Sequence, residues 1–159
     1  MRAEHINPFL RSIANTFETM LGCDLQRGEI VLKKQKNLQF PISGVIGLTG
    51  KAVGTVVINL SEAVALNAAS TMLMMECGEV DEDVIDAVGE IANMVAGAAK
   101  AELEEFDLSV SLPNVVTGEK HDIKFPSNAT PICVPFQCKW GPLQLEVGLE
   151  TVGASVAHA

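Results

Sequence analysis

The chain has 159 residues and a formal net charge of −9 at pH 7, with 20 acidic and 11 basic side chains. A surface of this charge repels phosphate backbones and anionic lipids, so the composition argues against binding to nucleic acid or to a membrane surface. Hydrophobic residues make up 48% of the chain, enough to form the core of one domain. We expect a single domain over residues 1–152 and a small, polar tail at 153–159 that frays.

The N-terminal sequence MRAEHINPFL lacks the apolar run and cleavage site of a secretory signal, and no stretch approaches the roughly 18 apolar residues of a membrane span. These features predict a cytoplasmic protein. The four cysteines form no CxxC pair, which favours reduced, buried thiols. The three histidines show no metal-ligand spacing, so we expect no metal site in this chain.

The first predicted helix begins near Asn7, which suits an N-cap, with Pro8 at the first helical position, and it ends at Gly22. Spacings of three and four residues predict the side of this helix that enters the core. The residues on that side are Phe9, Leu10, Ile13, Phe17, Met20 and Leu21.

Three strands are predicted next, at residues 28–34, 41–48 and 53–60, and a turn at 49–51 joins the last two into a hairpin. A second helix follows, with Ser61 as its expected N-cap and residues 77–78 as its end. Three methionines of this segment are expected to fill the core. They are Met72, Met74 and Met75.

A long third helix is predicted at residues 81–106. The three acidic residues at its start supply an N-cap candidate and negative charge beside the positive end of the helix dipole. Its core side is predicted to hold Val84, Ile85, Val88, Ile91, Ala92, Val95, Ala99 and Leu103. A narrow stripe on the opposite side faces water or a partner. The stripe consists of Asp86, Glu90, Asn93, Gly97, Lys100 and Glu104.

Three more strands are predicted, at residues 109–117, 132–138 and 143–149, with a loop at 118–130. A helix followed by three strands therefore occurs twice. This order predicts an α+β fold in which three helices cover a largely antiparallel six-stranded sheet made of two pseudo-repeated halves.

In the register of the repeat, Asn15 of the first helix corresponds to Asn93, but Ser12 stands where Glu90 would be. At these two positions, only the later helix therefore carries both a carboxylate and an amide. Gly97, together with Ala101, leaves the surface beside that pair free of long side chains, so a partner could approach closely.

Glu90 and Asn93 lie one helical turn apart and are predicted to point the same way. A carboxylate can bind a lysine of a partner, and an amide can orient a water molecule because it both donates and accepts hydrogen bonds. Phosphoryl transfer depends mainly on such positioning and on charge stabilisation. A Glu and an Asn at this spacing are also common on exposed helices, and Asp86 and Pro113 also suit a solvated helix position and a strand edge.

At these residues the chain resembles a known family. The segment DAVGEIANMVAGAAKAEL resembles the signature helix of the CheC/CheX/FliY phosphatases of bacterial chemotaxis, and INPFLRSIANTFETMLG and LSVSLPNVVTG resemble CheX in particular. The resemblance implies that Glu90 and Asn93 are the catalytic pair, that Asp86 is the first motif residue, and that Pro113 is the distant proline. Pro113 follows Asn93 somewhat sooner than in the family motif.

The resemblance further implies a phosphatase that removes the phosphoryl group from the phospho-aspartate of a CheY-like response regulator. Glu90 would engage the active-site lysine of the regulator, and Asn93 would hold the attacking water. The Mg²⁺ ion would belong to the regulator, so this chain would bind no cofactor of its own. A single Glu-Asn pair resembles CheX rather than CheC, because CheC carries two such pairs. The resemblance to CheX implies a homodimer formed by joining two sheets.

Two other interpretations remain open from the sequence. The chain could be a CheX-like adaptor that binds a receiver domain without speeding its dephosphorylation. It could also be an unrelated structural dimer in which a second copy covers the stripe. The presence of Asn93 beside Glu90 favours the enzyme, because a docking surface has no need of an amide that orients water.

Overall fold

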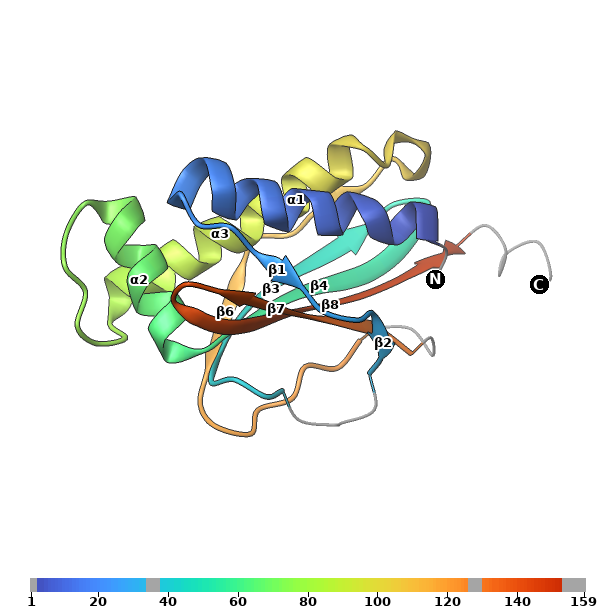
Figure 1. The fold of residues 1–159 in the computed structure, drawn as a ribbon. Coiled ribbons are helices and arrows are strands. Elements are labelled where there is room, and N and C mark those ends of the chain that lie inside the picture. The colour runs from blue at the N-terminus through green and yellow to red at the C-terminus, as the bar shows by residue number, and fades with distance from the viewer. Residues whose placement is uncertain (1–2, 34–37, 126–129, 153–159) are drawn as a thin grey trace.

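The computed structural model describes residues 3–33, 38–125 and 130–152 (Figure 1). The helices are α1 (Ala3–Leu21), α2 (Glu62–Leu73), α3 (Glu82–Ala101) and the short 3-10 helix η1 (Glu104–Phe106). The strands are β1 (Gln26–Arg27), β2 (Val31–Leu32), β3 (Ile42–Thr49), β4 (Ala52–Leu60), β5 (Ser109–Val110), β6 (Asn114–Thr117), β7 (Ile132–Cys138) and β8 (Gly141–Thr151). The predicted tail at 153–159 lies outside the described residues, as do residue 34 of the first predicted strand and residues 126–129 of the predicted loop.

The strands form one sheet in the order β1-β7-β8-β4-β3-β5, in which β2 also pairs with β7 and β6 also pairs with β3. Every described pairing is antiparallel. The order is symmetrical about the central β8–β4 pair. The short strands that follow α1 pair with the hairpin of the second half, and those that follow α3 pair with the hairpin of the first half. This exchange supports the predicted duplication.

The three helices cover one face of the sheet (Figure 1). Alternate residues of the central strands join the same buried apolar cluster as the inner sides of the helices, as period-two side-chain alternation requires. From β4 and β8 these residues are Val56, Ile58, Leu60, Leu143, Leu145, Val147 and Leu149. The main core therefore lies between the sheet and the helices.

The opposite face of the sheet carries a buried polar network. The Cys133 thiol donates to Gln144 Oε1 (3.5 Å), Gln144 Nε2 donates to Asn59 Oδ1 (3.3 Å), and Asn59 Nδ2 donates to Ser43 Oγ (2.8 Å). Ser43 Oγ lies 2.7 Å from His121 Nε2. These bonds fix the segment around residue 121 over the sheet and satisfy polar groups that would be costly to bury alone.

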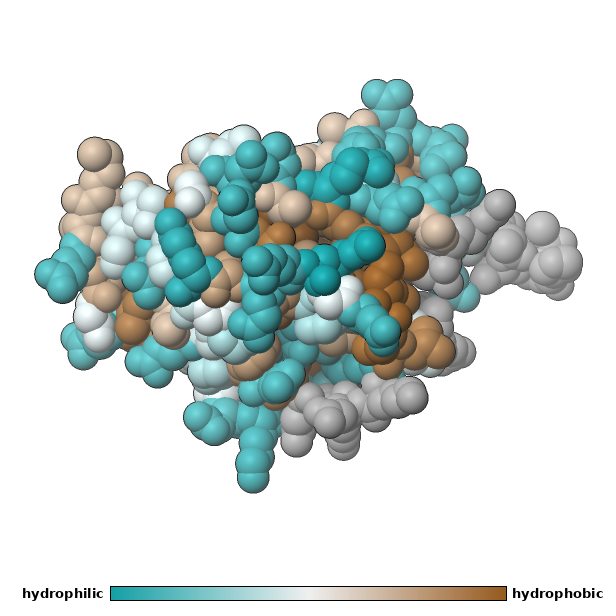
Figure 2. Space-filling view, in the orientation of Figure 1, coloured by the Kyte–Doolittle hydropathy of each residue, from teal (hydrophilic) through white to brown (hydrophobic). Residues whose placement is uncertain are grey.

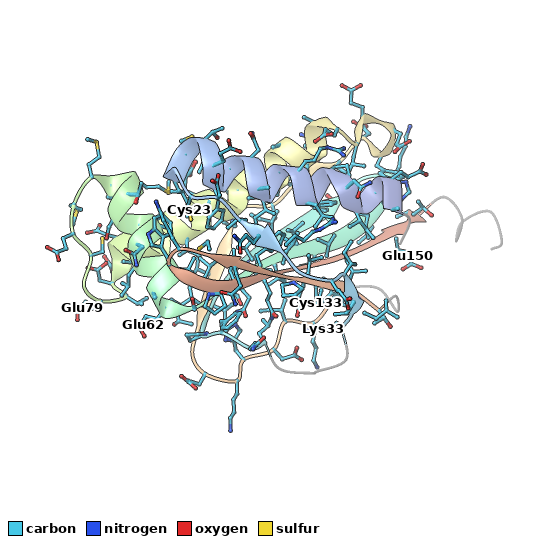
Figure 3. The ribbon with its side chains drawn as sticks, in the orientation of Figure 1. Cys23, Lys33, Glu62, Glu79, Cys133 and Glu150 are labelled. Atoms are coloured by element: carbon cyan, nitrogen blue, oxygen red, sulfur yellow. The ribbon has the colours of Figure 1, made fainter. Side chains whose placement is uncertain are left out.

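A buried ion pair lies beside this network. Lys33 Nζ is 3.0 Å from Glu146 Oε1 and 3.4 Å from Asp122 Oδ1, and its side chain is close to that of Cys133 (Figure 3). Burial raises the pKa of Glu146 even though Lys33 acts in the opposite direction. Burial, together with the Glu146 charge, also raises the pKa of the Cys133 thiol to about 11. This cysteine is accordingly a weak nucleophile at neutral pH.

The α+β architecture is confirmed, but the sheet has eight strands where six were predicted. The predicted strand at 28–34 is present only at its centre, as β2, and β1 lies just before it. Gly28, between the two, lies against Pro135, where a Cβ would come within 2.8 Å of the proline ring. The predicted strand at 109–117 is similarly interrupted between β5 and β6. The predicted third helix ends at Ala101, and its last residues form η1 instead.

The predicted start of the first helix is wrong. The helix begins at Ala3, so Asn7 is not its N-cap and Pro8 lies inside it. Tertiary contacts stabilise the first turn of the helix, which precedes Pro8. Ile6 is buried, and the His5 ring packs edge-on against the Phe106 ring, with centroids 4.8 Å apart. Helix capping signals in the sequence could not anticipate this long-range contact.

Three methionines that were expected in the core lie at the surface. Met20 is exposed in the last turn of α1, and Met74 and Met75 follow the end of α2, where helical spacing no longer determines their direction. Met74 adopts a left-handed conformation with φ of 54°. Ser61 does occupy the N-cap position of α2, but its side chain makes no capping hydrogen bond.

Candidate functional site

Helix α3 starts where the sequence predicted, because Asp81 caps it. Asp81 Oδ1 accepts a hydrogen bond from the Val84 backbone N–H (3.1 Å), which satisfies one of the free donors at the helix N-terminus. At the other end, Arg11 of α1 binds Glu102 through Nη2 and Oε1 (2.6 Å). The helix carrying the predicted site is thus fixed at both ends.

The middle of α3 packs closely on the sheet and on α1. A Cβ placed on Gly44 of β3 would lie 2.9 Å from Ala92 Cβ, so this glycine lets the helix approach the strand. On the side of α1, the buried Ser12 hydroxyl donates to the Val95 carbonyl (2.5 Å). These contacts determine the height and rotation of the turn that carries Asn93.

The core side of α3 is as predicted: seven of its eight expected residues are buried and Ile85 is half-buried. On the opposite side, Asp86 and Glu90 are exposed, and Asn93 and Gly97 are half-buried. Within the described ranges no hydrogen bond or ion pair engages the side chains of Glu90 and Asn93. Both groups are therefore free to bind a partner or a water molecule.

Pro113 is distant from α3 in sequence, but the fold brings it next to the stripe. A Cβ placed on Gly89 would lie 3.5 Å from Pro113 Cγ and 3.5 Å from Val115 Cγ2, which is van der Waals distance. Gly89 immediately precedes Glu90 and lies one helical turn before Asn93. The structure therefore places four predicted residues, Asp86, Glu90, Asn93 and Gly97, on one stripe, with Pro113 beside it.

Three neighbouring residues were not predicted as part of this surface. Gly89 was not among the residues predicted at this surface, yet its missing side chain makes room for Pro113. Ser111 and Leu112 fall in the break between β5 and β6, and Leu112 is 87% exposed. The sequence signal for them was the Leu-Pro pair inside an otherwise continuous strand pattern.

The corresponding position in the first half of the chain has lost this arrangement. Ser12, the counterpart of Glu90, is buried against α3, whereas Asn15 is exposed. Helix α1 thus uses the face of Ser12 for packing. At these two corresponding positions, only α3 has both a carboxylate, Glu90, and an amide, Asn93.

Within residues 3–33, 38–125 and 130–152, no three His, Cys, Asp or Glu side chains are grouped so that they could hold a metal ion. None of the helices in the same ranges is long and apolar enough to cross a membrane. On the stripe, the carboxylates of Asp86 and Glu90 can bind a cation such as a lysine, and the amide of Asn93 can orient water.

Comparison with known proteins assigns a family. A family model described as chemotaxis phosphatase CheX matches residues 42–137, a region that includes Glu90, Asn93 and Pro113. The CheY-P phosphatase CheX of Thermotoga maritima is 31% identical over 127 residues, which cover 78% of this chain and 82% of that protein. The chain belongs to the CheX family.

Solved structures agree with the assignment to the CheX family. The chemotaxis protein CheX of Vibrio vulnificus superimposes with a TM-score of 0.86 at 36% identity, covering 93% of this chain and 100% of that one. A CheX-CheY-BeF3-Mg²⁺ complex from Borrelia burgdorferi matches with a TM-score of 0.79 at 23% identity, covering 94% of this chain and 99% of that one. At 23% identity, the likeness to the Borrelia burgdorferi complex establishes the fold alone.

Proposed function

We propose that this CheX family member dephosphorylates the phospho-aspartate of a CheY-like response regulator. The observation that carries the proposal is the free Glu90–Asn93 pair on the outer side of a helix that is rigidly packed on its inner side. Family membership and the relative named as a CheY-P phosphatase support the same reaction.

In this mechanism α3 docks at the phosphorylation site of the regulator. The Glu90 carboxylate forms an ion pair with the active-site lysine of the regulator, and the Asn93 amide hydrogen-bonds the attacking water. Water attacks phosphorus in line, the bond between phosphorus and the aspartate oxygen breaks, and inorganic phosphate leaves. Holding the water in place removes much of the entropic barrier to attack.

Asp86, Gly97 and Pro113 have supporting roles in the proposal. Asp86 lies one turn before Glu90 on the same stripe and contacts the docked regulator. Gly97 is open to solvent, with no atom within 4 Å of a Cβ placed there, and it lets the backbone of the regulator come close to Asn93. Pro113 packs on Gly89 and supports the turn that carries the catalytic pair.

The Mg²⁺ ion of the reaction is bound by the regulator in this proposal, and this chain supplies no cofactor. Calorimetry tests the point directly. We expect no measurable Mg²⁺ binding by this protein alone, whereas stimulated dephosphorylation should depend on Mg²⁺ in the presence of the regulator.

The deciding experiment follows the decay of a CheY-type regulator charged with acetyl phosphate, with and without this protein. Wild type should accelerate decay, and Asn93→Ala should lower the stimulated rate by roughly 100-fold or more, as removal of one positioning hydrogen bond does in other enzymes. Asn67→Ala provides the matched control, because Asn67 is an exposed asparagine in another helix, α2.

The alternative function, a non-catalytic adaptor, has a distinct signature in the same assay. An adaptor would bind the phosphorylated regulator and leave its decay unchanged. An absence of both binding and acceleration with every receiver of the same organism would contradict either function.

We also propose a homodimer joined through the sheets, in the cytoplasm where response regulators act. Strand β2 supports this contact, because Ile30 just before it and both of its residues, Val31 and Leu32, are apolar and exposed. Figure 2 shows apolar side chains gathered over β2. Light scattering should give the mass of a dimer for wild type and of a monomer for Leu32→Lys, whereas Leu73→Lys at the exposed end of α2 should leave the mass unchanged.

A further inference from the structure

Leu112 is a large apolar residue that the fold holds in solvent next to the proposed catalytic pair. Its exposed fraction is 87%, and among the large hydrophobic residues of the described chain only Met74, at 92%, is more exposed. Its neighbour Pro113 packs on Gly89, one residue before Glu90 and one turn before Asn93. Leu112 therefore borders the surface on which the regulator would dock.

The backbone on both sides of Leu112 is held by specific contacts. The Ser111 N–H donates to the Gly47 carbonyl (2.9 Å), and the Gly47 N–H donates to Ser111 Oγ (2.8 Å). The same hydroxyl donates to the Leu112 carbonyl (2.9 Å). Pro113 restricts its own backbone and that of Leu112 before it. The Leu112 side chain therefore projects from an ordered segment, and little backbone entropy remains to be lost on binding.

Negative charge near the docking surface explains why an apolar contact would be useful there. The stripe carries the carboxylates of Asp86 and Glu90, the chain has a net charge of −9, and a phospho-aspartate is itself anionic. The negative charge of this chain therefore repels the phosphoryl group itself, and Glu90 can offset this only by its local pairing with a lysine. Burial of apolar area beside the pair supplies affinity that charge cannot.

We propose that Leu112 is an apolar anchor that inserts into a hydrophobic depression beside the phosphorylation site of the receiver domain, and that it determines which receivers are accepted. The inference rests on the proposed phosphatase function and extends it to the choice of substrate. In this proposal the docking surface runs from the open space at Gly97, past Asn93, to Leu112.

The test measures binding and turnover separately with Leu112→Ser. Binding uses the regulator activated with beryllofluoride, and turnover uses the acetyl-phosphate-charged regulator over a range of concentrations. We expect Kd and KM to rise by on the order of tenfold while kcat at saturation stays unchanged. Leu112→Met should restore both constants, and Met74→Ser, which removes a similarly exposed apolar side chain at the end of α2, should have no effect.

Each other outcome overturns the inference. An unchanged KM with Leu112→Ser, or a fall in kcat alone, would show that Leu112 is not an anchor. A change in the mass of the protein by light scattering would assign Leu112 to a contact between two copies of this chain. If wild type neither binds the regulator nor accelerates its decay, the proposed function fails together with this inference, whereas full wild-type activity with an inert Leu112 refutes the anchor alone.

Discussion

Gly44 of β3 lies directly beneath Ala92 of α3, so closely that no side chain fits between the strand and the helix. A Cβ on Gly44 would be 2.9 Å from Ala92 Cβ and 3.3 Å from the Val88 carbonyl oxygen. Ala92 is adjacent to Asn93, so the position of the proposed catalytic amide depends on a glycine in the sheet.

Gly44→Ala should displace α3 and destabilise the protein. Overpacking of a filled core costs about 1–3 kcal/mol, and a shift of Asn93 should also lower stimulated dephosphorylation. Urea unfolding and the decay assay measure the two effects. Gly47→Ala in the same strand is the control, because its Cβ would lie 3.5 Å from Ser111 Oγ, an ordinary contact distance. Equal stability of the two variants would contradict the close approach.

Asn93→Ala should separate activity from folding. Asn93 is half-buried and has no side-chain partner within the described residues, so its truncation should change the free energy of unfolding by about 0.5 kcal/mol or less. Val88→Asp should instead destabilise the fold by roughly 3–5 kcal/mol, because Val88 is buried and the new carboxylate has no partner. Thermal melts of both variants test which side of α3 carries Asn93. A strongly lowered melting temperature for Asn93→Ala would show that its side chain faces the core.

Gly97 should behave as a residue retained for binding at the expense of stability. Because the space around it is open, Gly97→Ala should stabilise α3 by about 0.5–1 kcal/mol through helix propensity alone. Gly97→Gln should keep most of this gain and yet weaken regulator binding, since the longer side chain blocks close approach. Calorimetric melts and titration with the activated regulator test both effects. Unchanged regulator affinity in Gly97→Gln would remove Gly97 from the docking surface.

Glu146 should make stability fall as the pH rises. Burial raises the pKa of Glu146 above its ordinary value of 4.5, so the folded state holds this proton more tightly than the unfolded state does. The contribution of Glu146 is fully present below pH 4.5, falls as the pH rises above that value, and is lost once the pH has risen through the folded-state pKa. Wild type should consequently lose stability relative to Glu146→Gln as the pH is raised from 4.5 toward 8.

The control for this pH dependence is Glu150→Gln. Glu150 lies in the same strand, β8, but is exposed at its end (Figure 3). Urea unfolding of the three proteins at several pH values should show a changing difference from wild type for Glu146→Gln and a constant one for Glu150→Gln. A constant difference for both would show that Lys33 fully compensates the buried charge.

Much of the fold could be predicted from local patterns. The β3–β4 hairpin and β7 lie within a residue of their predicted bounds, because alternation and turn residues specify a long strand locally. The cap at the start of α3 followed from the acidic residues there, and the two sides of the helix followed from spacing. The short strands β1, β2, β5 and β6 did not, since their pairing depends on neighbours that are distant in sequence.

The sequence by itself determined the fold class, the α3 stripe with Glu90 and Asn93, and the family resemblance, because each is encoded over a few consecutive helical turns or strands. Only the tertiary structure decided that Pro113 packs beside that stripe, that Leu112 projects next to it, and that Gly44 admits α3 to the sheet. These relationships join residues far apart along the chain. Their distances depend on the packing of the whole core, which no local pattern of residues specifies.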